Sequence, residues 1–417
     1  MARTADRVRR LSAARRRILA LALGAAMAWT GAMFARADST DVASVRLDAL
    51  SSRFLAGGVV LTLELSSPAP FTFFTLDAPR RLVIDYASST GEGPDELPDL
   101  APPLGEPRFG LFRPDRARVV VPLAQPMQVS RAAARAGAAG IEITLVPVPP
   151  DVFAARAGWP AGARWEDAAS PRDPVLPGDA RLVVAIDPGH GGIDPGAMSD
   201  GVMEKDVVLA FAQRLARHLE ASGGVRAVLT RERDIFLPLG ERVRIAQRAG
   251  AHVFISLHAD IVIEGEAAGV SVYTLAPEAS DAAAAELAER ENRADVLAGA
   301  EAAGVEDDVA RVLIELAQRG SMAEAERLAK ATLAMLRSEV ELLRSRPHRR
   351  ADFRVLKAPG IPSILIELGF LTSPVDRARI VTPGWQEMAA GGVARGVLDW
   401  AGETAPAWRA PRTAQRP

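Results

Sequence analysis

Two histidines and two glutamates, each next to a strongly apolar or helical run, constrain this chain more than any other feature. Three follow apolar runs and one opens a helical run; they are His190, His258, Glu367 and Glu204. Two imidazoles and one carboxylate are a common ligand set for catalytic zinc and leave a coordination position for water. A second carboxylate can accept the proton of that water. The four residues therefore predict a hydrolytic zinc site.

The position of these residues matters more than their identity. His190, His258 and Glu367 each lie at or just past the C-terminal end of a predicted strand, which is the edge where open α/β sheets build their sites. Taken singly, each has a structural alternative: Glu204 precedes a helix and is also suited to interact with its dipole.

Two aspartates beside the histidines are candidates for orienting them. Asp187 precedes His190 by three residues, and Asp260 follows His258 by two. A carboxylate bonded to the second ring nitrogen of a metal-binding histidine fixes the ring. An Asx turn is the equally good alternative for both.

The region 181–402 alternates strand and helix patterns, which predicts an α/β domain with a mainly parallel sheet and flanking helices. The predicted strands are Val183–Ile186, Arg226–Leu229, His252–Leu257, Gly269–Leu275, Phe353–Lys357 and Ser363–Glu367. The predicted helices are Val207–Leu219, Gly240–Ala249 and Trp385–Trp400.

The N-terminal half has a different pattern. Residues 38–147 contain short β-rich runs separated by turn residues, with no helix between them, and predict a small all-β sandwich domain. Residues 148–180 are rich in Pro, Gly, Ala and Asp and are interpreted as a linker. Residues 403–417 are interpreted as a disordered tail.

Residues 1–37 have the pattern of a signal peptide. A basic stretch, an apolar run and Ala35-Arg36-Ala37 follow one another, and the apolar run is too short to span a bilayer. Arg15-Arg16-Arg17 also resembles a twin-arginine export signal. We expect a periplasmic protein with no transmembrane anchor in the mature chain.

Composition excludes several other site types. The chain has no cysteine, so it forms no disulfide and offers no thiolate to a metal. Residues 1–37 carry eight Arg and one Asp, so their removal changes the formal net charge from −2 to −9. An acidic chain of this kind is a poor candidate for nucleic-acid binding.

One segment interrupts the alternation of strands and helices. Residues 277–346 place about seventy residues rich in Ala, Glu, Arg and Leu between two strands, far more than a crossover needs. Apolar residues recur at helical spacing within it. We interpret the excess as a helical insertion.

The motifs in this order resemble the zinc-dependent N-acetylmuramoyl-L-alanine amidases of the cell-division type. They are Asp-Pro-Gly-His-Gly-Gly, Glu-Lys-Asp-Val, Leu-Thr-Arg, Ser-Leu-His-Ala-Asp, Val-Tyr-Thr-Leu and Glu-Leu-Gly-Phe-Leu-Thr-Ser-Pro. The resemblance extends from about Leu182 to Ala401. The β-rich region resembles the sandwich domain that targets such enzymes to peptidoglycan. One departure is Ser373, where the family commonly has Asn.

The resemblance assigns roles to the four residues. It implies that Zn²⁺ is bound by His190, Glu204 and His258, and that Glu367 is the catalytic base. The implied reaction is hydrolysis of the amide between N-acetylmuramic acid and L-alanine in peptidoglycan, for septal wall splitting and daughter-cell separation.

The resemblance also implies that the insertion is regulatory. A helix would cover the cleft, and Glu291 would occupy the open position of the zinc until a protein activator of the division machinery binds the insertion. A solvated charge at the edge of an amphipathic helix is the alternative for Glu291.

Two other functions remain open from the residues. One is a different zinc peptidase of the cell wall, and the other is an inactive wall-binding scaffold of the division machinery. Intact ligand candidates and an intact Glu367 argue against the scaffold.

Overall fold

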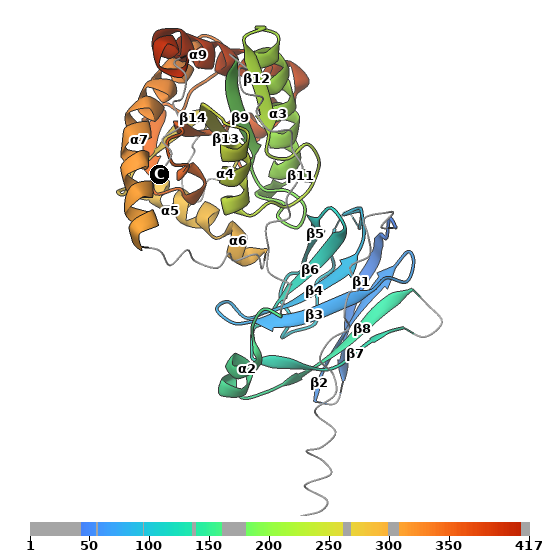
Figure 1. The fold of residues 1–417 in the computed structure, drawn as a ribbon. Coiled ribbons are helices and arrows are strands. Elements are labelled where there is room, and N and C mark those ends of the chain that lie inside the picture. The colour runs from blue at the N-terminus through green and yellow to red at the C-terminus, as the bar shows by residue number, and fades with distance from the viewer. Residues whose placement is uncertain are drawn as a thin grey trace, which may run out of the picture. The chain divides into compact units, whose positions relative to one another are not determined.

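The structure, a computed structural model, describes residues 43–55, 57–94, 96–135, 139–160, 181–261, 268–298 and 308–409 (Figure 1). For residues 308–320 and 404–409 it describes the backbone only. The predicted signal peptide and the residues after 409 lie outside the described part of the chain, as do residues 161–180 of the predicted linker.

The N-terminal domain consists of two four-stranded antiparallel sheets. One has the order β1 (Leu47–Leu55), β2 (Gly58–Leu65), β8 (Gly140–Pro147), β7 (Met127–Ala134). The other has the order β3 (Phe71–Leu76), β4 (Arg81–Ala87), β6 (Arg116–Pro122), β5 (Arg108–Arg113). The all-β domain expected from the sequence is confirmed.

Alternation along the strands produces this core. Val59, Leu61, Leu63 and Leu65 of β2 all point into one apolar cluster with residues of β8, β4 and β6. Successive side chains of a strand point to opposite faces, so every second residue is buried between the sheets.

The interpretation of residues 148–180 as a linker is wrong at its beginning. Helix α2 (Pro150–Arg156) forms there, with Pro150 at its first position, where a missing N–H costs no hydrogen bond. Phe153 is 1 % exposed and belongs to the sandwich core. Seven residues gave too little periodicity to reveal this helix in the sequence.

The C-terminal domain is built on one six-stranded mixed sheet. Its order is β12 (Val225–Leu229), β9 (Leu182–Pro188), β13 (Val253–His258), β16 (Ser363–Glu367), β14 (Ser271–Leu275), β15 (His348–Ala351). The first four strands are parallel, and β14 is antiparallel to β16 and parallel to β15. A hairpin of β10 (Met198–Ser199) and β11 (Val202–Met203) precedes the first long helix.

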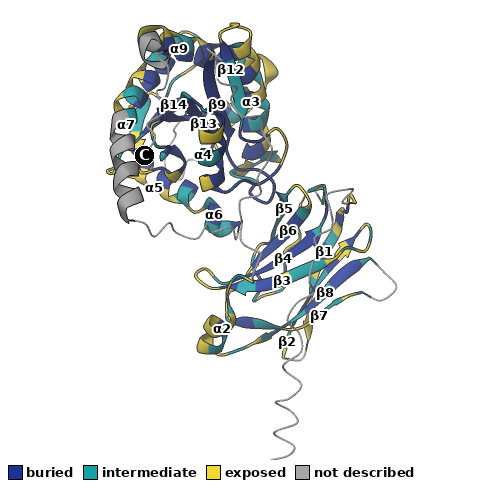
Figure 2. Ribbon diagram, viewed as in Figure 1, coloured by how far each residue is buried: buried dark blue, intermediate teal, exposed yellow. Residues whose placement is uncertain are grey.

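Helices cover both faces of this sheet, as expected. In β9, Val184 and Ile186 pack with α3 (Glu204–Glu220), α7 (Asp308–Leu336) and α9 (Pro383–Arg409). Val183 and Ala185, which alternate with them, pack on the other face with a second set of elements. These are α4 (Leu239–Arg248), α5 (Ala282–Asn292) and the 3₁₀ turn η1 (Arg354–Leu356). Figure 2 shows that the strands β9 and β13 of this sheet are buried. The edge strands β12 and β15 are partly exposed.

Three details of the sequence interpretation are corrected. The strand expected at Phe353–Lys357 is η1, and the edge strand is β15, a basic segment whose polar side chains suit a sheet edge. Helix α9 continues to Arg409, past its expected end at Trp400 and into the tail that was expected to be disordered from residue 403. The C-terminal part of α7 contributes Leu328 and Leu333 to the main core, so part of the supposed insertion is a crossover helix.

Two short elements complete the domain: α6 (Ala294–Leu297) follows α5, and α8 (Pro374–Ile380) follows the strand that ends at Glu367. Within the described residues, every helix is too short or too polar to cross a bilayer.

Candidate metal centre

The loop after β9 brings His190 to the carboxyl edge of the sheet. His190 itself has a φ of 55°, a left-handed conformation that is uncommon for a residue with a side chain. At Gly189, an added Cβ would lie 2.6 Å from the ring of His258. The glycine at this position is therefore required for the two imidazoles to approach each other.

Glu204 opens helix α3 and is fully buried. Its Oε1 accepts a hydrogen bond from the backbone N–H of Ala259 at 2.8 Å, and its Oε2 accepts one from Ala197 at 2.8 Å. Two separate loops thus hold the carboxylate, which explains why it is buried at a helix start instead of being solvated there.

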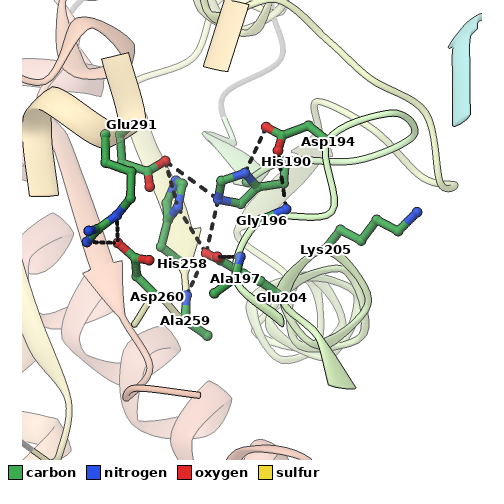
Figure 3. A network of polar contacts seen from close by, with 12 residues as sticks. His190, Asp194, Gly196, Ala197, Glu204, Lys205, His258, Ala259, Asp260 and Glu291 are labelled. Carbon is green, nitrogen blue, oxygen red and sulfur yellow. Dashed lines mark hydrogen bonds and ion pairs between the residues drawn. The ribbon is translucent and has the colours of Figure 1, made fainter. Parts of the chain in front are cut away.

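These two residues and His258, the last residue of β13, converge on one point (Figure 3). One ligand atom from each lies within 4.8 Å of the others. Glu204 Oε1 is 3.2 Å from Nε2 of His190 and 3.2 Å from Nδ1 of His258.

The donor set fits a metal ion. His190 Nε2 and His258 Nδ1 are buried, and neither has a hydrogen-bond partner among the described residues. Buried polar atoms are normally paired, so an unpaired lone pair on each ring requires an explanation. A cation between two imidazoles and a carboxylate supplies one. The structure therefore brings together the three predicted ligands in a group that could hold a metal.

The charge of the site supports the same conclusion. Burial lowers the pKa of the His258 imidazole, but Glu291 and Glu204 outweigh it and raise that pKa to about 9. Burial likewise lowers the pKa of the His190 imidazole. The carboxylates of Glu204, Asp194 and Glu291 outweigh this effect and hold that pKa well above its usual value. The cluster thus attracts positive charge strongly, as a cation site must.

The residue that orients His190 is Asp194, which the sequence interpretation missed. Its Oδ2 lies 2.9 Å from Nδ1 of His190, so Nε2 is left to face Glu204. Burial raises the pKa of Asp194, but its other interactions, chiefly the contact with His190, outweigh burial and lower this pKa to about 2. Asp194 stands four residues after His190 in a turn-rich loop, and its position within that loop gave no sequence signal.

Asp187, the predicted orienting residue, has other partners. It accepts hydrogen bonds from Thr230, Ser256 and Arg242, at 2.5, 2.9 and 3.0 Å. Arg242 also donates to the carbonyl oxygen of His190 at 2.8 Å. Asp187 therefore acts on the histidine loop through Arg242 and its backbone contacts, and its expected contact with the imidazole is replaced by that of Asp194.

A second buried arginine supports the same loop. Arg231 donates to the carbonyl oxygens of Pro188, Gly189 and Lys205, at 3.0, 2.8 and 2.8 Å. It is 1 % exposed and joins the histidine loop to the first turn of α3, which carries Glu204. The Leu-Thr-Arg motif is thus a support for two of the three candidate ligands.

Glu367 lies at the end of β16, in register with His258 on the neighbouring strand. It is fully buried, its Oε2 accepts a hydrogen bond from the backbone N–H of Asp260 at 3.2 Å, and its Oε1 has no partner among the described residues. Burial raises the pKa of Glu367 well above its usual value, although His258 lowers it in part. A carboxylate with a raised pKa and a free oxygen is suited to accept a proton.

Asp260 is also buried, but it is bonded to a helix that covers the site. Its Oδ2 accepts a hydrogen bond from Nε of Arg290 at 2.8 Å. Burial, together with Glu291 and Glu204, raises the pKa of Asp260 to about 7, and Arg290 opposes this shift. Among the described contacts, none joins this carboxylate to the His258 ring, so it is not positioned as the predicted orienting group.

Glu291 comes from α5 and reaches the same point as the three ligand candidates (Figure 3). Its Oε2 is 3.2 Å from Nδ1 of His258 and 3.6 Å from Nε2 of His190. Glu291 is 5 % exposed and lines the pocket that contains both histidines. A second carboxylate thus lies where a fourth ligand of the cation would be.

Comparison with known proteins places this α/β domain in a class. The family described as N-acetylmuramoyl-L-alanine amidase matches residues 184–399, and the AMIN domain matches residues 51–145. The N-acetylmuramoyl-L-alanine amidase AmiA of Escherichia coli (strain K12) is 41 % identical over 222 residues, which are 53 % of this chain and 76 % of AmiA.

A second relative spans both domains. AmiC, an N-acetylmuramoyl-L-alanine amidase of Neisseria meningitidis, is 32 % identical over 361 residues, which are 81 % of this chain and 85 % of AmiC. The solved structure of the amidase AmiC2 of Nostoc punctiforme is 31 % identical, with a TM-score of 0.39, and covers 53 % of this chain and 97 % of that one. The chain belongs to the N-acetylmuramoyl-L-alanine amidases and carries an N-terminal AMIN domain.

Proposed function

We propose that this amidase is a zinc enzyme that cleaves the amide between N-acetylmuramic acid and L-alanine in peptidoglycan. The observation that carries the proposal is the pair of unpaired ring nitrogens of His190 and His258, buried beside the Glu204 carboxylate. Zinc bound there would polarise a water molecule and the substrate carbonyl group.

The residues of the chain would perform the proton transfers. Glu367 accepts the proton of the water, which its raised pKa and its free Oε1 favour, and then delivers this proton to the leaving nitrogen. Asp194 holds the His190 ring through Nδ1, and Arg231 and Arg242 hold its loop. No covalent intermediate is required.

We further propose that the enzyme is autoinhibited by α5 and α6. The support for this proposal is that the Glu291 carboxylate lies beside both histidines, in the region where the water and the substrate carbonyl would bind. A tethered carboxylate competes at high effective concentration, so a partner that displaces the helix would activate the enzyme. The expected partner is a protein activator of the division machinery that binds the helical insertion.

The remaining proposals concern location. The family and the basic, apolar and small-residue segments of residues 1–37 support export to the periplasm, with the twin-arginine route as a hypothesis. The AMIN domain would hold the enzyme at the cell wall during septal splitting.

Metal analysis and product analysis test the catalytic proposal together. The protein should contain one zinc per chain, and His190→Ala and His258→Ala should lose it. Purified muropeptides should yield free glycan and intact stem peptides, whereas shortened stem peptides would indicate a peptidase. Stoichiometric zinc in both variants would refute the ligand assignment.

A further inference from the structure

Asp260 and Arg290 form an ion pair that the proposed reaction leaves unexplained. The Asp260 carboxylate is 3 % exposed, its Oδ1 accepts a hydrogen bond from the N–H of Ile261, and its Oδ2 is bonded to Arg290. Its backbone N–H is bonded to the catalytic candidate Glu367. Asp260 therefore stands beside the proposed base, and its side-chain cation comes from the helix that must leave.

The two residues at this end of α5 place opposite charges side by side. The Arg290 guanidinium pairs with the Asp260 carboxylate. The carboxylate of Glu291, the next residue, lies beside His190 and His258 (Figure 3). An amide undergoing hydrolysis has the same two poles. Its carbonyl oxygen becomes negative and needs the metal, and its nitrogen becomes an amine that gains a proton.

A buried carboxylate that loses its cation is unfavourable unless another donor replaces it. Displacement of α5 removes Arg290 from Asp260 just as it removes Glu291 from the histidines. The substrate that enters would bring an amide N–H, and later an ammonium group, into this region. The charge of Asp260 matches both.

We propose that Asp260 is a catalytic residue that binds the scissile nitrogen of the substrate, and that Arg290 with Glu291 covers the site as a substrate mimic. This rests on the proposed amidase function. As the bond from water oxygen to the carbonyl carbon forms and the C–N bond breaks, Glu367 moves one water proton to nitrogen, which gives the neutral amine and a carboxylic acid. The proton of that acid then passes to the amine and forms the ammonium group. Asp260 accepts a hydrogen bond from that nitrogen throughout and pairs with the ammonium product.

Breaking the ion pair from its two sides distinguishes this role from that of a simple latch. In the full chain, Arg290→Ala should raise the basal rate of peptidoglycan hydrolysis about fivefold or more, because the cover is weakened. Asp260→Asn added to Arg290→Ala should lower kcat/KM about tenfold relative to Arg290→Ala alone, because a charge-assisted hydrogen bond is lost. Arg293→Ala is the matched control, since that arginine is exposed on the same helix and pairs with Glu289.

A latch alone predicts that Asp260→Asn and Arg290→Ala raise the rate equally and that the double variant is no slower than Arg290→Ala. That outcome would overturn the proposal. Zinc content and the unfolding temperature must match between the variants, and Asp260→Glu, which keeps the charge, should recover part of the rate if Asn disturbs the fold.

Inhibition by the product peptide gives a reading that folding does not affect. A stem peptide with a free L-alanine amine should inhibit Arg290→Ala more strongly than the same peptide acetylated on that amine, and Asp260→Asn should abolish this preference. Equal inhibition by both peptides in Arg290→Ala refutes the role of Asp260. If neither Arg290→Ala nor the variant lacking residues 279–320 releases any stem peptide, the amidase function itself fails, which is a separate result.

Discussion

Helix α3, on one side of the candidate metal centre, and helix α5, which covers that centre, are attached to the domain by different interactions. Helix α3, which begins with Glu204, buries Phe211, Leu215 and Leu219 in the main core. Helix α5, which carries Glu291, buries two alanines and a single leucine. Each large apolar side chain contributes about 1.5–3 kcal/mol when buried, so α5 has much less apolar attachment than α3.

Polar contacts at α5 and α6 replace part of the missing apolar area. Besides Arg290 and Glu291, Asp295 accepts a hydrogen bond from the backbone N–H of Leu239 at 2.9 Å, at the start of α4. That helix has no cap from the residue preceding it, so a carboxylate of the covering segment fulfils this function. Helix α3 is therefore attached mainly by apolar packing, and α5 and α6 depend more on polar contacts, as the proposed displacement of α5 requires.

The largest expected effect is on turnover, when Glu367, the proposed catalytic base, is changed. Glu367→Gln should lower turnover ~10²–10⁴-fold with zinc and fold retained, because the amide is nearly isosteric but accepts no proton. Initial rates on purified peptidoglycan, with zinc analysis of the same sample, measure this. Near-normal turnover of the zinc-loaded variant would remove Glu367 from the mechanism.

The next effect concerns the residue that orients His190. Asp194→Asn should weaken zinc affinity about 10- to 100-fold, because loss of a carboxylate behind a ligand histidine typically has this effect. Competition with a chelator measures the affinity. Asp200→Asn is a suitable control, since Asp200 is exposed in the same region and pairs with Arg377. Equal affinities in the two variants would contradict the role given to Asp194.

Changes in the covering segment should have a smaller effect on activity than the change at Glu367, and they should raise activity instead of lowering it. Deletion of 279–320 or Glu291→Ala should raise basal activity, by roughly 5- to 150-fold if the coupling is of ordinary size, and more for the deletion, which also removes the steric block. Dye release from labelled peptidoglycan without any partner measures this. Glu289→Ala is the control on the exposed face of α5.

The possible outcomes separate the parts of the cover. A native chain already as fast as the deletion variant would refute autoinhibition. A faster deletion with an unchanged Glu291→Ala would keep the cover and remove only the role of Glu291 as a fourth ligand.

The smallest effect is on stability in acid. Burial raises the pKa of Asp187, but Arg242, Thr230 and Ser256 lower it more, so the net shift is downward. A carboxyl group whose pKa is lowered by folding stabilises the fold at pH values above its unfolded pKa of about 3.9. This stabilisation is lost as the pH falls through the folded pKa. The difference in unfolding free energy between the native chain and Asp187→Asn should therefore be constant near neutral pH and shrink below about pH 4. A difference that does not change with pH would contradict the stabilising role given to the ionised Asp187 carboxylate.

The sequence alone predicted the fold class and the three ligand candidates that the structure brings together. Apolar runs that end in His190, His258 and Glu367 place these residues at one sheet edge, because parallel strands share the direction of their carboxyl ends. Period-two alternation in strands such as β2 similarly determined the sandwich.

Tertiary structure decided which groups support the site. Whether Asp187 or Asp194 faces the His190 ring depends on a left-handed residue and on Arg242, which arrives from another helix. Local spacing does not encode such contacts, because they depend on where distant elements pack. For the same reason α2 was not predicted. Its one buried residue, Phe153, packs into the assembled sandwich core, which local sequence spacing does not reveal.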